Sequence, residues 1–147
     1  MTKHDAMKAF FEPKVMEMVG DLLNVNFSPE CNGSVTFITN YSDKVLKQFI
    51  RGNARKEYGF SIVITKPYSV EGDDLNLEAM NFAQAFMDWM EEQNRKKNYP
   101  ELPGNCKIVR MENLQNMPNL AGVNPEAGLA RYMMQCRLIY DEYEVMT

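Results

Sequence analysis

The 147-residue sequence has little of the chemistry that enzymes and metal sites use. It contains one histidine, His4, three widely separated cysteines, and no glycine-rich phosphate-binding motif. A Ser-His-Asp or Cys-His nucleophilic site could be assembled only with His4, and a lone histidine near the terminus is a poor general base or metal ligand. We therefore expect a protein that is not an enzyme, with no catalytic residues, no metal and no cofactor.

Long apolar runs are also absent. No segment approaches the ~20 apolar residues that span a bilayer, and the N-terminal residues lack the apolar core of a secretory signal. An odd number of cysteines without CxxC spacing is typical of reduced thiols in the cytosol. With 45% hydrophobic and 24% charged residues, the chain is expected to fold as one soluble globular domain, 1–147.

The periodicity of apolar residues predicts two helices and five strands. The helices cover 5–23, where Pro13 should kink the helix or start a second segment, and a longer one that begins at a cap, Asp73 or Asp74. The strands cover 34–40, 44–51, 58–65, 106–112 and 130–143. The order α-β-β-β-α-β-β predicts an α+β fold with a mostly antiparallel five-stranded sheet and two main helices.

The final strand, 130–143, alternates most strictly. Its even-numbered apolar residues are predicted to face the core, whereas its odd-numbered residues are mostly polar. Met133 and Ile139 interrupt this polar face, which favours a covered or interacting surface. From this strand and the second helix, the predicted structural core consists of Phe82, Phe86, Trp89, Tyr132, Cys136 and Leu138.

Positive and negative charges are separated along the chain. Residues 44–66 contain six basic residues and one acid, and residues 71–92 contain seven acids and no base. Ordinary solvated surface is one interpretation. The other is a head-to-tail contact, in which the hairpin of one subunit meets an acidic face of its neighbour. The candidate acidic face consists of Asp73, Asp74, Glu78 and Asp88.

The same basic hairpin, 44–66, supports an alternative function as a nucleic-acid-associated regulatory module. The net charge of −4 and the sequence pI of about 5.1 argue against a dedicated nucleic-acid-binding protein.

The segment 113–128 is long for a connection between paired strands, so it is either mobile or an assembly arm; we favour an arm. With the hairpin and the last strand, it completes the candidate subunit interface, which consists of Arg51, Arg55, Lys56, Met117, Leu120, Val123, Arg131, Met133, Arg137 and Ile139.

Two segments resemble a phage family. FMDWMEEQNRKKNYPELPG (86–104) resembles the helix end, basic stop and proline-flanked loop of tail terminator proteins of long-tailed, siphovirus-type phages of Gram-positive bacteria, which are often labelled minor capsid proteins. ARYMMQCRLIYDEY (130–143) resembles the closing strand of that family.

The resemblance implies a small α+β subunit without catalytic residues. It would form a homo-oligomeric ring, a hexamer, that caps the tail tube and joins it to the head. The implied partners are other copies of the chain, the tail tube protein and the head-completion or connector protein, with a passive contact with DNA in the lumen and no membrane. The implied location is the head-proximal end of the virion tail, and the host cytoplasm before assembly.

Overall fold

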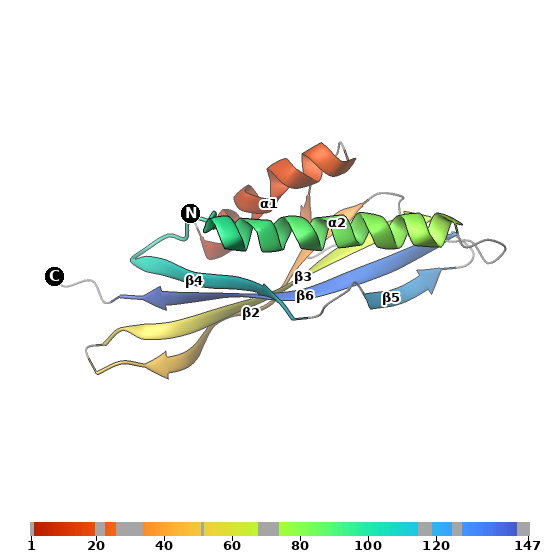
Figure 1. The fold of residues 1–147 in the computed structure, drawn as a ribbon. Coiled ribbons are helices and arrows are strands. Elements are labelled where there is room, and N and C mark those ends of the chain that lie inside the picture. Colours follow the sequence, from red (N-terminus) through yellow and green to blue (C-terminus); the bar gives the residue numbers. More distant parts are fainter. Residues whose placement is uncertain are drawn as a thin grey trace.

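In the computed structural model, two helices lie on one face of a six-stranded sheet (Figure 1). The structure describes residues 2–19, 23–25, 34–50, 52–67, 74–114, 119–124 and 128–143. The elements in chain order are α1 (Lys3–Val19), β1 (Asn24–Val25), β2 (Val35–Gln48), β3 (Ala54–Pro67), α2 (Asp74–Lys96), β4 (Cys106–Asn113), β5 (Asn119–Asn124) and β6 (Leu129–Glu142). The predicted α+β class with a mostly antiparallel sheet is confirmed.

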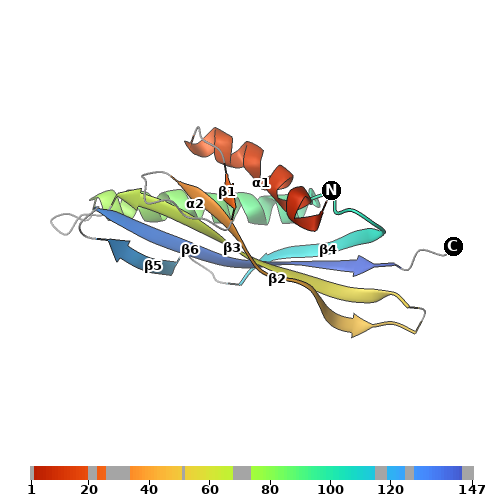
Figure 2. The same ribbon diagram turned by 180° about the vertical axis from the view of Figure 1, so that it is seen from behind.

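The strands follow the spatial order β1-β2-β3-β6-β4, and β5 also pairs with β6. Only the short β1–β2 pair is parallel among the described strands. β4 and β5 lie one after the other along the same edge of β6, because β4 pairs with 136–142 and β5 pairs with 129–133 (Figure 2). One edge of the sheet is therefore formed by β1 and β2, and the opposite edge by β4 and β5.

The predicted set of five strands differs from the observed six in three places, one of which is the short β1, which was not predicted. The segments 34–40 and 44–51 form one strand, β2, whose pairing with β3 shifts register around Tyr41 and Lys44. Asp43 lies inside this irregularity with a φ of 56°. These shifts break the two-residue periodicity on which the sequence prediction relied, so one bent strand resembles two.

The segment 113–128, predicted to be an assembly arm, contains strand β5. Leu120 pairs with Tyr132 and Val123 pairs with Ala130, with a register shift between Leu120 and Gly122. This irregularity places both apolar residues on the same face at an odd spacing, which hides the strand pattern in the sequence.

Helix α1 runs without interruption from Lys3 to Val19 with Pro13 inside it, so Pro13 does not start a second segment. Pro13 is exposed, which allows water to solvate the backbone carbonyl that loses its donor. The first turn of α1 is tied to the sheet. Lys3 Nζ lies 2.6 Å from Asp43 Oδ1, and His4 Nδ1 lies 2.6 Å from Tyr58 Oη.

The core lies between the helices and the sheet. Phe11 from α1 contacts Phe60 from β3 at 5.5 Å and Phe86 from α2 at 6.1 Å between ring centroids. Phe37 from β2 stacks on Phe60 at 5.2 Å. All four rings are completely or almost completely buried. This aromatic cluster joins both helices to the centre of the sheet, and buried methionines fill the remaining space: Met7, Met87, Met90, Met111 and Met134.

Candidate assembly interface

The residues predicted to form the structural core lie on the helix-covered face of the sheet. Phe86, Tyr132, Cys136 and Leu138 are buried there, and Phe82 and Trp89 are partly buried against the same cluster. Burial raises the pKa of the Cys136 thiol to about 12. This thiol is therefore a small apolar group that fills space in the core.

The odd-numbered residues of β6 lie on the opposite, open face of the sheet, as the alternation predicts. Arg131 and Met133 are partly buried there. Ile139, however, is only 2% exposed, so the prediction that it contributes to an accessible interface was wrong. Its direct cross-strand neighbours are Glu57 on β3 and Arg110 on β4. The long side chains around Ile139 cover it within the single chain.

Arg137, another predicted interface residue, is bound within the chain. Its Nη2 lies 2.8 Å from Glu112 Oε2, and its Nη1 lies 3.4 Å from Glu57 Oε1. Glu57 is 4% exposed, and Arg110 also pairs with Glu112. The hydrogen bond to Glu112 raises the pKa of Arg137. The arginine thus neutralises a buried carboxylate, a structural role that leaves it little capacity for a neighbouring subunit.

Two basic residues of β3 next to the turn of the β2–β3 hairpin are paired inside the chain. Arg55 Nε lies 2.8 Å from Asp141 Oδ1, and Lys56 Nζ lies 3.0 Å from Glu142 Oε2. The hydrogen bond from Lys56 holds the pKa of Glu142 below its usual value. The separation of charge along the sequence is therefore not a separation in space at these positions. Arg51, the third predicted basic interface residue, lies outside the described residues.

The distal half of the hairpin is open to solvent. Residues 41–48 of β2 are all exposed, including Val45 at 52% and Leu46 at 42%. Ile50 at the turn is 105% exposed. Phe49 N donates a hydrogen bond of 2.8 Å to Asn53 O, which closes a defined turn. We call residues 49, 50, 52 and 53 the hairpin tip. The sequence prediction did not include these apolar residues in the interface. Their position among lysines was the available signal that they are exposed.

A second exposed surface lies beside β4 and β5. Its position follows from the flank of helix α2 that faces these strands. Asn94 Oδ1 accepts a hydrogen bond of 3.0 Å from Met111 N, and Met87 O accepts one of 3.4 Å from Asn113 Nδ2. This flank of α2 therefore faces β4. Met80 precedes Met87 by roughly two helical turns, so it lies on the same flank, further along towards β5.

Leu120 and Val123 point to the helix-covered side of the sheet, because they pair with Tyr132 and Ala130 of the core. Yet Leu120 is 55% exposed and Val123 is 38% exposed. Exposed apolar side chains at the same end of α2 extend this surface. We call the set the edge patch: Leu77, Met80, Leu120 and Val123.

Other predicted residues are more dispersed. Glu78 and Asp88 are exposed on α2, where Asp88 accepts a hydrogen bond of 3.0 Å from Gln84. Helix α2 starts at Asp74, whose side chain lies outside the described part of the structure, as do Asp73 and Met117. The predicted acidic face thus reduces to two described carboxylates.

The fold of the chain is similar to that of a solved structure. It is similar to a chain in the structure "Virion of native gene transfer agent (GTA) particle", with a TM-score of 0.60 and 15% sequence identity, over 95% of this chain and 97% of that chain. The two chains share a fold. No protein-family model matches the sequence, and no curated protein matches it either.

Two further properties of the described residues complete the picture of the site. None of the helices in these ranges is long and apolar enough to cross a membrane. Within the same ranges, histidine, cysteine and carboxylate side chains do not gather in groups of three or more that could hold a metal ion. The features that stand out in the described structure are therefore its exposed apolar surfaces.

Proposed function

We propose that the protein is a structural component of a phage-like virion. The observation that carries this proposal is the fold shared with a chain of the gene transfer agent virion over 95% of one chain and 97% of the other. Because nearly the whole of each chain takes part, the likeness covers the complete arrangement of helices and sheet. The exposed apolar side chains of the hairpin tip and edge patch support it, since apolar residues grouped on a surface are typical of a protein that binds other proteins.

More specifically, we propose a tail terminator. Six copies would form a ring on the head-proximal end of the tail tube, in contact with the tube protein below and the head connector above. The two sequence segments that resemble the tail terminator family support this role. They correspond to the end of α2 with the loop that follows it, and to the long strand β6.

The two candidate surfaces favour a ring. The hairpin tip continues β2 and β3, whereas the edge patch lies by β4 and β5 on the opposite edge of the sheet (Figure 2). A contact between unlike surfaces is heterologous, and such contacts close into rings when the rotation permits. In this proposal the hairpin contacts a neighbouring copy, and the edge patch is a second contact surface for assembly.

Electron microscopy of particles tests this function. The protein is labelled with gold-conjugated antibody in particles from cells that carry its gene, and we expect the label at the head–tail junction. Cells without the gene should produce tails of irregular length that are not joined to heads. Label on the head shell or the distal tail, or normal particles without the gene, would contradict the proposal. Antibody against an abundant coat protein should instead label many positions on the particle, and it serves as the control.

The nucleic-acid-binding alternative has less support, because Arg55 and Lys56 are neutralised by Asp141 and Glu142. It predicts DNA affinity that falls steeply with salt and disappears when Arg51, Arg55 and Lys56 are replaced by alanine. A titration with duplex DNA at low salt that shows no binding removes this alternative.

A further inference from the structure

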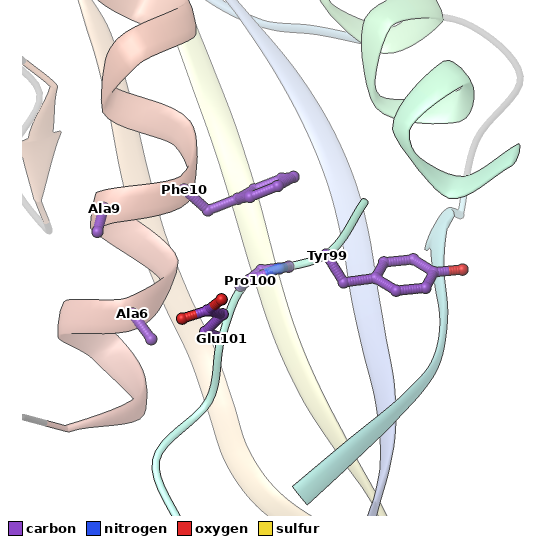
Figure 3. Close-up of a pocket in the computed structure, with 6 residues that line it drawn as sticks. All are labelled: Ala6, Ala9, Phe10, Tyr99, Pro100 and Glu101. Carbon is purple, nitrogen blue, oxygen red and sulfur yellow. The ribbon is translucent and has the colours of Figure 1, made fainter. Parts of the chain in front are cut away.

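A groove runs along α1, between this helix and the chain that leaves α2. One end is lined by Ala6, Ala9, Phe10, Tyr99, Pro100 and Glu101 and has a volume of about 230 Å³ (Figure 3). The other end, of about 390 Å³, shares Ala9 and Phe10 and continues to Pro13, Lys14, Glu17, Trp89, Gln93 and Asn98. The shared residues make the two hollows one feature, which we call the α1–α2 groove.

The floor of the groove is apolar. Phe10 packs on Trp89 with 5.6 Å between ring centroids, and both rings are only partly buried. Pro100 is buried and continues the apolar surface towards Glu101, and Figure 3 shows the Phe10 ring above Pro100. Aromatic rings that remain half-exposed in a hollow provide a favourable site for an apolar side chain from another molecule.

The rim of the groove carries two acids and one base. Glu101 is exposed at one end, and the side chain of Glu17 is 72% exposed at the other. Lys14 lies between them, and its ammonium is 3.4 Å from Glu17 and 5.9 Å from the centroid of the Trp89 ring. Lys14 and Glu17 therefore offset each other, and the excess negative charge of the rim lies at Glu101. The groove accordingly suits an apolar group that is flanked by positive charge.

The hairpin tip has these properties. Ile50 is the most exposed of the large apolar side chains in the described residues, at 105%. Lys47 lies nearby on exposed β2, with its ammonium 5.3 Å from the centroid of the Phe49 ring. The closed turn holds Ile50 outward, so little conformational entropy is lost when it binds.

We propose that the α1–α2 groove receives the hairpin tip of a second copy of this chain. Ile50 of one copy packs against Phe10 and Trp89 of the next, and Lys47 lies by Glu101 at the rim. Complementary charge around an apolar anchor argues for this occupant. The inference rests on the proposed ring and refines it, because it gives the hairpin a receiving surface, the groove, in place of the acidic face of α2 that the sequence predicted.

Interchain cross-linking distinguishes these two receiving surfaces. Ile50→Cys is expressed with either Ala9→Cys, in the groove, or Ala85→Cys, on the outer face of α2, in cells that carry the remaining genes of the particle. All three positions are exposed, so the substitutions leave the fold intact. Cys31 and Cys106 are replaced by serine in every variant, and the two copies carry tags of different size.

We expect an oxidised heterodimer with Ala9→Cys at a yield at least about fivefold above that with Ala85→Cys. Equal or higher yield with Ala85→Cys, or no cross-link with either, overturns the groove proposal. The proposed function is judged separately by the position of the protein in particles. A protein found at the head–tail junction without the Ala9 cross-link would keep the function and lose the groove contact.

A second variant tests the anchor itself. Ile50→Asp should abolish the association between tagged copies in a pull-down from these cells, whereas Ile50→Leu should retain it. Because Ile50 is fully exposed, the unfolding temperature of Ile50→Asp should equal that of the wild type. Undiminished association of Ile50→Asp also overturns the proposal.

Discussion

The aromatic ring of Tyr41 lies directly on the backbone of Gly59. A Cβ atom at position 59 would be 2.4 Å from both Cε1 and Cζ of that ring, which is far inside van der Waals contact. The two residues are partners across β2 and β3, at the place where the register of this pair shifts. Glycine at 59 thus allows β2 to bend while its tyrosine remains packed on the sheet.

Gly59→Ala should displace the Tyr41 ring and lower the free energy of unfolding by about 1–3 kcal/mol, as overpacking usually does. Gly122→Ala is a matched control, because a Cβ atom at position 122 would meet no other atom within 4 Å. Chemical denaturation of Gly59→Ala, Tyr41→Ala and the double variant provides the measurement. The double variant should be no less stable than Gly59→Ala, and strictly additive losses would refute the contact.

Ile139→Asp should lower the free energy of unfolding by about 3 kcal/mol or more, because it places a charge at a position that is 2% exposed. Met133→Asp, on the same face but only partly buried, should cost roughly 1 kcal/mol. Thermal unfolding of the two single variants compares them directly. If Ile139→Asp were as stable as Met133→Asp, the claim that Ile139 is buried within the single chain would be wrong.

Arg137→Gln should destabilise the protein by about 2 kcal/mol, because it leaves the buried carboxylate of Glu57 without its cation. The side chain of Arg137 is 30% exposed, so the loss is smaller than for a fully buried pair. Replacing Glu57 by glutamine as well should recover part of this stability. Urea denaturation of the four proteins in this cycle measures the coupling, and a coupling of zero contradicts the assigned role.

Acid should weaken the protein partly through Glu142. The hydrogen bond from Lys56 holds the pKa of this carboxyl below 4.5 in the folded state, so its contribution to stability is present above pH 4.5 and is lost as the pH falls through the folded pKa. Glu142→Gln should therefore be less stable than the wild type at neutral pH, and the difference in unfolding temperature should close in acid. Glu101→Gln, at an exposed carboxylate outside this ion pair, is the matched control for the substitution itself.

Trp89→Ala should lower the free energy of unfolding by about 3 kcal/mol, at the lower end of the range for large aromatic residues because Trp89 is only partly buried. Its ring contacts Phe10, Phe11 and Phe86 at centroid distances of 5.6, 5.9 and 5.7 Å. Trp89→Phe keeps most of this contact and should cost less than half as much. Differential scanning calorimetry of both variants checks this, and equal losses would contradict a packing role.

Local periodicity predicted much of the fold because it depends only on neighbouring residues. The apolar stripe of α2, with Phe86 at its centre, and the alternation of β6 both lead to the observed α+β arrangement. β5 and the single strand β2 escaped prediction because bulges at Leu120–Gly122 and around Tyr41 interrupt the regular pattern. A bulge leaves no clear signature in one sequence, since it is the pairing partner that defines it.

The candidate interface was harder to predict. Alternation placed Ile139 and Arg137 on the open face of β6, but it carries no information about what covers that face. The partners of Arg137 and Arg55 are at least 25 residues away in sequence, so only the folded chain brings them together. In contrast, the exposure of Ile50 follows from local structure alone, because Ile50 lies in a tight turn beyond the last paired residues of β2 and β3.

By itself, the sequence determined the class of the fold and the inward faces of α2 and β6, because the distribution of apolar residues fixes which side of an element leaves water. Only the tertiary structure decided which charges are neutralised and which apolar residues remain outside. Those outcomes depend on distant segments that meet across the sheet. The apolar surfaces that remain exposed in the folded chain, the hairpin tip and the edge patch, are the ones available for contacts with other subunits.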